Sequence, residues 1–342
     1  MNRGAEIARK VILSVRKLTT TFPTKRGPFN AVEDVSFDVL ECERVAIVGE
    51  SGSGKSMTML SILRLVPKPG KVAAGTVDYN GANLLKLSAE QICQLRGSEI
   101  SLVFQDPMAS WNPVLRIGRQ IGEAMRLHRK IKRSKIAERI IELLSHVGIP
   151  VPAQRSKDYP HQFSGGMRQR GMIGMALANY PNLLIADEPT TALDVTVQDQ
   201  IIRLLRQINE ENGTAILLVT HNLALVASLC ERVIVMYAGR ILETGTTEQI
   251  FYNPQHPYTW GLLQSIPRLG TAETEQLVGI PGQPIDPSQE VQGCKFHPRC
   301  AFRVDRCAKE EPGLEEIERG HRARCWVLMK NVKGAERHAA NG

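Results

Sequence analysis

One short stretch, 49–56, constrains the fold of this chain more than any other. Its sequence, Gly-Glu-Ser-Gly-Ser-Gly-Lys-Ser, has the form G-x-x-x-x-G-K-[ST] and lies between an apolar run, 44–48, and a helix-like stretch, 57–63. Glycines let the backbone wrap around a polyphosphate with its N–H groups turned inward, and a helix N-terminus adds partial positive charge at the same place. The strand–loop–helix order therefore predicts a nucleotide phosphate site on an α/β fold.

Each part of this loop has an expected role. Lys55 can reach the β- and γ-phosphate oxygens, and the hydroxyl of Ser56 can ligate Mg²⁺. The residues expected to contact the nucleotide here are Gly49, Glu50, Ser51, Gly52, Ser53, Gly54, Lys55 and Ser56.

A second nucleotide motif is the stretch 183–189, Leu-Leu-Ile-Ala-Asp-Glu-Pro. An apolar strand that ends in an acid brings that carboxylate to the edge of the sheet, so Asp187 is expected to hold Mg²⁺ directly or through water. Glu188 points elsewhere along the backbone and is placed to orient or deprotonate an attacking water.

The bulk composition indicates a soluble chain with a sizeable core. Of 342 residues, 42% are hydrophobic and 23% charged, and the net charge is +8. We find no N-terminal signal peptide and no transmembrane stretch, so the chain is expected to be cytosolic unless a partner holds it at a membrane. The basic stretch 126–135 fits a solvated helical surface, with a membrane or nucleic-acid face as the alternative.

Strands and helices are expected to alternate along the chain, which indicates a largely parallel sheet. Two β-rich runs near the N-terminus, 11–22 and 31–39, predict an antiparallel β subdomain. Helical periodicity over 117–147 predicts a helical subdomain at about 106–171. Composition changes near Phe251, so we expect a main domain over 1–251 and an extension over 252–342 that ends in a frayed tail.

A third stretch, 163–170, is Phe-Ser-Gly-Gly-Met-Arg-Gln-Arg. Ser164, Gly165 and Gly166 at a helix start make a second anion-binding site, although an ordinary serine cap with a glycine turn explains them equally well. Two phosphate-binding sites in one chain can both be used in a dimer, where the second site of each chain contacts the nucleotide bound to the other chain.

These motifs together resemble the ATP-binding subunits of ABC transporters. The stretch 49–56 is similar to Walker A, Gln105 to the Q-loop, and 164–166 to the signature. Asp187 and Glu188 are similar to Walker B with its catalytic glutamate, 192–194 to the D-loop, and His221 to the switch histidine. All six occur in the family's order over roughly residues 10–250.

The resemblance implies a mechanism. Two ATP molecules would lie between Walker A of one subunit and the signature and D-loop, with Asp194, of the other. Lys55 and the loop amides would neutralise phosphate charge, and Ser56, Asp187 and Gln105 would organise Mg²⁺. Glu188 would polarise the water and His221 would contact the γ-phosphate. Closure of the dimer would pull on membrane subunits through the region around Gln105.

Two positions depart from the general family pattern. The usual signature is Leu-Ser-Gly-Gly-Gln, and here Phe163 and Met167 stand at its ends, a form similar to the dipeptide/oligopeptide importer subgroup. The family also stacks an aromatic residue on adenine. Phe22, at the end of the first strand, is the expected match, and Phe29 is its rival.

The C-terminal part resembles the peptide/nickel importer ATPases in the stretches 253–263 and 293–300. Four cysteines follow the spacing C-x5-C-x6-C-x17-C: Cys294, Cys300, Cys307 and Cys325. Four thiolates suit a tetrahedral zinc or a cubane cluster. The resemblance implies a structural [4Fe–4S] cluster, with zinc or four reduced thiols as the alternatives.

The expected function is therefore that of the ATP-hydrolysing subunit of an importer for peptides or a related small solute. It would sit peripherally on the cytoplasmic face of the inner membrane, with a second ATPase, two permeases and, indirectly, a solute-binding protein, and without nucleic acid. The alternatives are a soluble ABC ATPase acting on DNA or ribosomes, and an exporter ATPase. The cargo (peptide, nickel, sugar or opine) and the choice between homodimer and heterodimer stay open.

Overall fold

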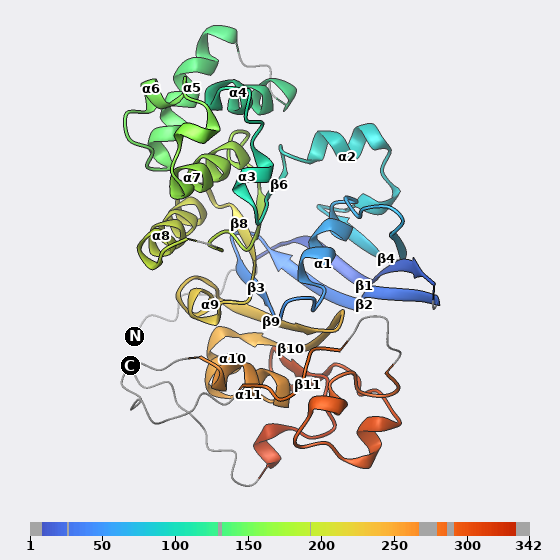
Figure 1. The fold of residues 1–342 in the computed structure, drawn as a ribbon. Coiled ribbons are helices and arrows are strands. Elements are labelled where there is room, and N and C mark those ends of the chain that lie inside the picture. The colour runs from blue at the N-terminus through green and yellow to red at the C-terminus, as the bar shows by residue number, and fades with distance from the viewer. Residues whose placement is uncertain are drawn as a thin grey trace. The chain divides into compact units, whose positions relative to one another are not determined.

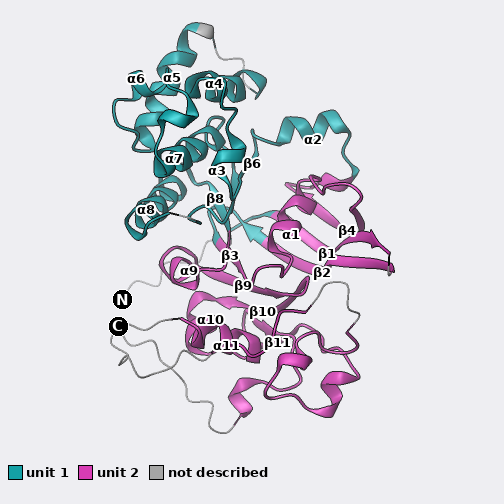
Figure 2. Cartoon of the chain, in the orientation of Figure 1, with its two compact units in different colours: residues 1–12, 39–44, 86–218 teal, residues 13–38, 45–85, 219–342 magenta. Residues whose placement is uncertain are grey.

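The computed structural model describes residues 9–25, 27–128, 132–191, 193–266, 279–285 and 291–332 (Figure 1). The chain forms two compact units that interleave along the sequence (Figure 2). Unit 1 comprises residues 1–12, 39–44 and 86–218, and unit 2 comprises residues 13–38, 45–85 and 219–342. The domain boundary expected near Phe251 lies within unit 2 and stays a prediction.

The described part of unit 1 contains three neighbouring strands, with β7 between β6 and β8. β6 and β7 are parallel, and Ile100 pairs with Leu183 at the start of their register. The first four residues of β7 are fully buried, as expected for a parallel strand covered on both faces. The strands are β6 (Ile100–Val103), β7 (Leu183–Asp187) and β8 (Ala215–Thr220).

Helices make up most of the rest of unit 1. Ile117, Ile121 and Met125 recur on one face of α4 and are completely buried, which confirms the predicted helical period. Leu127 is 67% exposed because it lies two residues after Met125 and therefore falls on another face of α4. The helices are α2 (Ala89–Leu95), α3 (Pro107–Ser110), α4 (Ile117–His128), α5 (Arg133–His146), α6 (Pro152–Arg155), α7 (Gly165–Ala176) and α8 (Val195–Asn212).

The short helix α6 lies where the sequence indicates only a loop between two prolines. Pro152 occupies its first turn, where the missing N–H of proline costs no hydrogen bond and the fixed φ angle favours helix. The segment between Pro150 and Pro160 therefore contains one helical turn.

The residues of unit 2 that the structure describes form two groups of strands. In the first group the order is β2-β1-β4-β5, and β4 is antiparallel to both β1 and β5. In the second group the order is β11-β12-β10-β9-β3, in which β3 and β9 are parallel and β9 and β10 form an antiparallel hairpin. The strands are β1 (Val11–Thr24), β2 (Gly27–Leu40), β3 (Arg44–Val48), β4 (Lys71–Tyr79), β5 (Ala82–Asn83), β9 (Arg232–Tyr237), β10 (Arg240–Thr246), β11 (Glu315–Glu318) and β12 (His321–Ala323).

Among the described residues, unit 2 contains four α-helices, and three of them begin with a side-chain cap. Thr246 caps α10 with a complete capping box, and Asn222 and His256 accept backbone N–H groups at the starts of α9 and α11. The helices are α1 (Lys55–Ile62), α9 (Leu223–Leu229), α10 (Thr247–Tyr252) and α11 (Pro257–Gln264).

The C-terminal extension is partly a continuation of the second group of strands. β12 pairs with β10, and β11 pairs with β12, which the sequence did not indicate. The cysteines lie in the more irregular part, which contains 3₁₀ turns at 297–299 and 305–308. Among the described residues, no helix is both long and apolar enough to cross a membrane.

Candidate functional site

The predicted phosphate loop follows β3 and leads into α1, in the strand–loop–helix order that the motif requires. Gly49 has a φ of 154°, and a Cβ added to it would lie 2.2 Å from the backbone oxygen of Met236. Gly54 has a φ of 98°, and its Cβ would lie 2.6 Å from the backbone oxygen of Ala31. Only glycine fits at both positions, so these residues fix the path of the loop.

Lys55 is the first residue of α1 and is only 5% exposed. Its ammonium group donates to the backbone oxygens of Gly49 and Glu50, at 2.7 and 2.8 Å, and lies 3.3 Å from the hydroxyl of Ser53. The positive charge therefore sits inside the loop, where the backbone amides and the α1 N-terminus also favour an anion.

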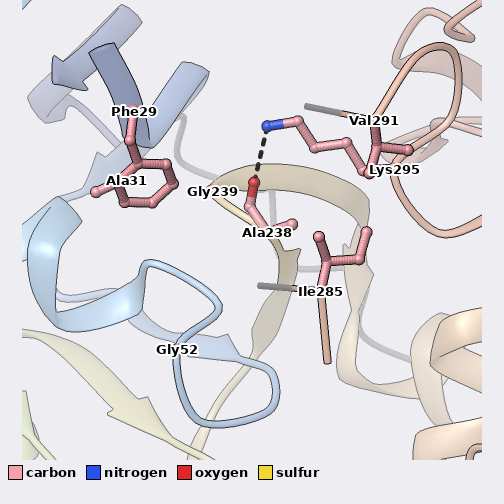
Figure 3. A pocket seen from close by; sticks show the side chains of 8 residues that line it. All are labelled: Phe29, Ala31, Gly52, Ala238, Gly239, Ile285, Val291 and Lys295. Atoms are coloured by element: carbon pink, nitrogen blue, oxygen red, sulfur yellow. Dashed lines mark hydrogen bonds between the residues drawn. The ribbon is translucent and has the colours of Figure 1, made fainter. Parts of the chain in front are cut away.

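A pocket opens beside this loop, and its walls come from the loop itself, from β2, from the turn between β9 and β10, and from the C-terminal extension (Figure 3). Phe29 contributes an aromatic ring, and Lys295 donates a hydrogen bond of 3.0 Å to the backbone oxygen of Ala238. The lining residues are Phe29, Ala31, Gly52, Ala238, Gly239, Ile285, Val291 and Lys295.

The two aromatic candidates for adenine stacking differ in their surroundings. Phe29 lines the pocket together with Gly52 of the phosphate loop. Phe22 packs instead against Gly70, where an added Cβ would lie 2.4 Å from the Phe22 ring. The pocket residues from the extension, Ile285, Val291 and Lys295, have no signal in the sequence that associates them with a nucleotide.

In unit 1, Gln105 and Glu188 are brought together. The side-chain amide of Gln105 donates a hydrogen bond of 2.8 Å to Oε2 of Glu188. The hydroxyl of Thr191 donates a second hydrogen bond, also of 2.8 Å, to the same oxygen. Glu188 follows directly after β7 and has a left-handed φ of 46°. Two donors thus hold one carboxylate oxygen, and sequence reasoning had found Gln105 but missed Thr191.

The predicted signature forms the start of α7. Ser164 is exposed, and its hydroxyl accepts the backbone N–H of Met167 at 3.2 Å. A Cβ on Gly166 would lie 2.9 Å from Val197 of α8, so this glycine permits close packing of the two helices. The serine therefore caps the helix, as the simpler interpretation expected, and a role toward ATP stays a prediction.

Two further predicted residues lie at exposed ends of elements. Asp194 caps α8 by accepting the backbone N–H of Val197 at 2.9 Å, while its D-loop neighbour Ala192 lies outside the described residues. His221 is exposed directly after β8, and Asn222 then caps α9. Asp187 is half-buried at the end of β7.

The four C-terminal cysteines are reduced and lie in the extension. Burial raises the pKa of the Cys294 thiol to about 11 and that of Cys325 to about 12, and the other cysteines add to both increases. The thiols are thus near enough to influence one another. In the part of the chain that the structure describes, however, no three or more His, Cys, Asp or Glu side chains are close enough to form a metal site.

Comparison with known protein families gives two matches. The ABC transporter model matches residues 32–191, and the model of the oligopeptide/dipeptide transporter C-terminal region matches residues 242–307. The first match includes the phosphate loop, Gln105, the 164–166 stretch and Glu188. The second includes three of the four C-terminal cysteines.

Individual relatives are similar over nearly the whole chain. The oligopeptide transport ATP-binding protein OppD of Bacillus subtilis (strain 168) is 45% identical over 95% of this chain and 91% of its own length. The dipeptide transport ATP-binding protein DppD of Escherichia coli (strain K12) is 46% identical over 94% of this chain and 98% of its own.

Among solved structures, the chain is similar to the ATP-binding cassette MJ0796 in a dimeric post-hydrolysis state with ADP and Pi. The TM-score is 0.63 and the identity 27%, over 69% of this chain and 98% of the cassette.

Proposed function

The chain belongs to the family of ABC transporter ATP-binding proteins, and from this premise we propose that it binds and hydrolyses ATP to drive an importer of peptides or a related small solute. One observation supports the importer class most directly, namely that the similarity to oligopeptide and dipeptide ATP-binding proteins extends through the C-terminal region. Such relatives cover the extension as well as the nucleotide motifs, so the likeness is not confined to the part that all ABC ATPases share.

The phosphate end of ATP would be held by the loop 49–56. Lys55 would exchange its bonds to the backbone oxygens of Gly49 and Glu50 for bonds to the β- and γ-phosphates. The α1 N-terminus and the inward N–H groups would share the remaining negative charge. Ser56, Gln105 and Asp187 would hold Mg²⁺, which neutralises charge on the transferred phosphoryl group.

Hydrolysis needs a water molecule directed at the γ-phosphate, and Glu188 is the residue proposed to polarise it. The hydrogen bonds from Gln105 and Thr191 to Oε2 hold the carboxylate of Glu188 in one orientation, and this carboxylate would accept the proton of the water. His221, at the exposed end of β8, is proposed to contact the γ-phosphate.

We propose that a second ATPase subunit completes each nucleotide site. Ser164 and Asp194 are exposed at the starts of α7 and α8, and both helices are long enough to carry an N-terminal dipole. The start of α7 at 164–166, where Ser164 is exposed, would contribute to the ATP held by the partner, together with Asp194. The dimeric state of the MJ0796 cassette supports this arrangement by similarity.

The adenine ring is proposed to stack on Phe29 or Phe22, and the surroundings favour Phe29. Phe29 shares a pocket with the phosphate-loop residue Gly52, whereas the ring of Phe22 covers Gly70. Phe22 was the first expectation from the sequence, and direct comparison of the two variants decides between them.

We further propose that Cys294, Cys300, Cys307 and Cys325 hold a structural [4Fe–4S] cluster, with zinc as the alternative. The donor chemistry fits, because four reduced cysteines lie within the segment 294–325 of the extension. The sulfur atoms as they stand do not form a ligand group, so binding would draw them together. Such a group would cross-link the extension, and no step of ATP hydrolysis depends on it.

The protein is proposed to act on the cytoplasmic face of the inner membrane beneath two permease subunits, which a solute-binding protein supplies. The test is affinity capture from detergent-solubilised native membranes followed by mass spectrometry, with peptide uptake measured in cells that carry Glu188→Gln. We expect two permeases and a second ATPase to co-purify, and uptake to stop. An exposed-lysine variant, Lys86→Ala, serves as the matched control. Ribosomal or DNA-associated partners without a permease would refute the importer.

A further inference from the structure

Glu50 of the phosphate loop is bonded to the C-terminal extension, and this contact has a functional consequence. Resting on the proposed ATPase function, we propose that Arg299 is a positioning residue of the nucleotide site. Arg299 neutralises the carboxylate of Glu50 and fixes it in place, so that the loop can accept a triphosphate.

The contact between the two residues is a bidentate ion pair. Nη1 of Arg299 donates to Oε2 of Glu50 at 2.7 Å, and Nη2 donates to Oε1 at 3.1 Å. The Arg299 side chain is 5% exposed and that of Glu50 25% exposed. The pair is thus largely shielded from water, which makes its geometry and charge matter more than those of a surface ion pair.

Arg299 is itself held in place on several sides. Its Nε donates to the backbone oxygen of Pro281 at 3.0 Å, and Nη2 donates to that of Gly282 at 3.3 Å. Its guanidinium also lies 5.8 Å from the ring centroid of Tyr237. A guanidinium with its donors engaged in this way has little freedom to leave Glu50.

The main chain of Glu50 is fixed by the extension as well. Its backbone N–H donates a hydrogen bond of 2.9 Å to the hydroxyl of Tyr258 in the first turn of α11. Tyr258 is fully buried against Tyr237 and Phe296, with ring centroids 4.8 and 5.3 Å away. Both the side chain and the backbone of Glu50 therefore depend on residues after 251.

The charge of Glu50 explains why a partner is needed. An acidic side chain in a loop that binds a polyphosphate repels the ligand unless a cation compensates it. Arg299 provides that cation, so the carboxylate and the triphosphate do not face each other as uncompensated negative charges. If Glu50 is made neutral, the positive charge of Arg299 is no longer needed for ATP binding. The effect of removing Arg299 with and without the charge of Glu50 therefore separates an electrostatic role from a purely structural one.

The test is a set of substitutions measured in the assembled transport complex. We expect Arg299→Gln to raise the KM for MgATP by about tenfold, as for loss of a charge-assisted bond, with a much smaller change in kcat. Adding Glu50→Gln to Arg299→Gln should return the KM to within about threefold of the wild type, because the unpaired charge is gone. The defect of Arg299→Gln should also diminish at high salt.

Arg324 provides the matched control. Like Arg299 it is a buried arginine of the extension next to a cysteine, but its bonds go to Ile241, Pro312, Asp34 and Glu311 rather than to the loop. Arg324→Gln should lower the melting temperature and leave the KM unchanged. If Arg299→Gln does not assemble, Arg299→Lys, which keeps the charge and loses the bidentate fork, takes its place with a smaller rise in KM.

Three results would overturn the inference: an unchanged KM in Arg299→Gln, a double variant with a higher KM than Arg299→Gln alone, or an equal KM rise in Arg324→Gln. These results are distinct from failure of the proposed function, which would appear as absent ATP turnover in the wild type. Lys55→Ala identifies turnover that belongs to this site, since it removes the phosphate-binding ammonium.

Discussion

The side-chain amide of Gln105 donates a hydrogen bond of 2.8 Å to the carboxylate of Glu188, across 83 residues of sequence. Thr191 donates to the same oxygen from the turn that follows Glu188. The two donors fix the direction in which the second oxygen of Glu188 points. The orientation of the proposed base is therefore set before any nucleotide binds.

This orientation can be tested by removing each donor. We expect Gln105→Ala and Thr191→Val each to lower kcat about tenfold, because a hydrogen bond to a charged group is lost, and to change nucleotide affinity less. Glu188→Gln, which removes the proton acceptor, should lower kcat by about a hundredfold or more while ATP still binds. Persistent hydrolysis in Glu188→Gln, measured by phosphate release, would identify another residue as the base.

The enclosed ammonium of Lys55 leads to a prediction about binding. Lys55→Ala should weaken MgATP affinity roughly tenfold to a hundredfold, since charge-assisted bonds to two phosphates are lost. Equilibrium titration with a fluorescent ATP analogue measures the effect, and Lys71→Ala, which changes an exposed lysine at the start of β4, is the control. Equal affinities in the two variants would contradict the assignment of the loop.

The two aromatic residues near the N-terminus give opposite expectations. Phe29→Ala should weaken ATP affinity by roughly three- to tenfold, in line with the loss of one base–aromatic stack, and should leave the melting temperature nearly unchanged. Phe22→Ala should lower the melting temperature, because its ring packs against Gly70, and should leave affinity nearly unchanged. The reverse pattern would restore Phe22 as the stacking residue.

The nucleotide motifs were predictable because each is local: a loop, a strand end or a helix start carries its chemistry within about eight residues. The contacts that organise these motifs are not local. Gln105 reaches Glu188 across 83 residues, and Arg299 reaches Glu50 across 249 residues. Nothing in the sequence near Glu50 indicates which cation compensates it.

The C-terminal strands escaped prediction for a different reason. β11 and β12 are four and three residues long, and β11 consists of Glu-Glu-Ile-Glu, so no alternation of apolar and polar residues marks it. The pairing of β12 with β10, and of β11 with β12, supplies the structure instead. The choice between Phe22 and Phe29 as the adenine-stacking residue could not be made from the sequence for a similar reason. It depends on tertiary packing, because Phe22 packs against Gly70 and Phe29 lines the pocket.

The cysteine proposal predicts a metal content that depends on all four thiols. Anaerobic purification should yield a brown protein with about four irons and matching acid-labile sulfide per chain. Replacing Cys307 by Ser should lower the iron content and the melting temperature, whereas replacing the exposed Cys93 should change neither. A content of one zinc per chain would show that the four cysteines hold tetrahedral zinc and not an iron–sulfur cluster. A wild-type protein that contains no metal and has normal stability would refute both assignments.

Two buried histidines contact Glu243, His256 through its backbone N–H and His321 through its ring. Their contributions to the free energy of unfolding should depend on pH in opposite directions. Burial lowers the pKa of His256 from 6.5 to about 3. Burial also opposes protonation of His321, but hydrogen bonds with Glu243, at 2.7 Å, and Glu318 raise its pKa above 6.5. His256 therefore reduces the free energy of unfolding as pH falls below 6.5, because the unfolded chain takes up the proton first. The contribution of His321 is complete below 6.5 and is lost as pH rises through its folded pKa.

Urea unfolding across pH 5 to 9 tests this pair of effects through two variants. His256→Asn, which keeps an acceptor for the α11 cap, should remove part of the loss of stability on the acidic side. His321→Gln, which keeps a donor for Glu243, should remove part of the decline on the alkaline side. Each histidine changes the slope by at most about 1.4 kcal/mol per pH unit. The exposed His161→Asn should follow the wild-type curve, and identical curves for all four proteins would show that neither histidine couples stability to pH.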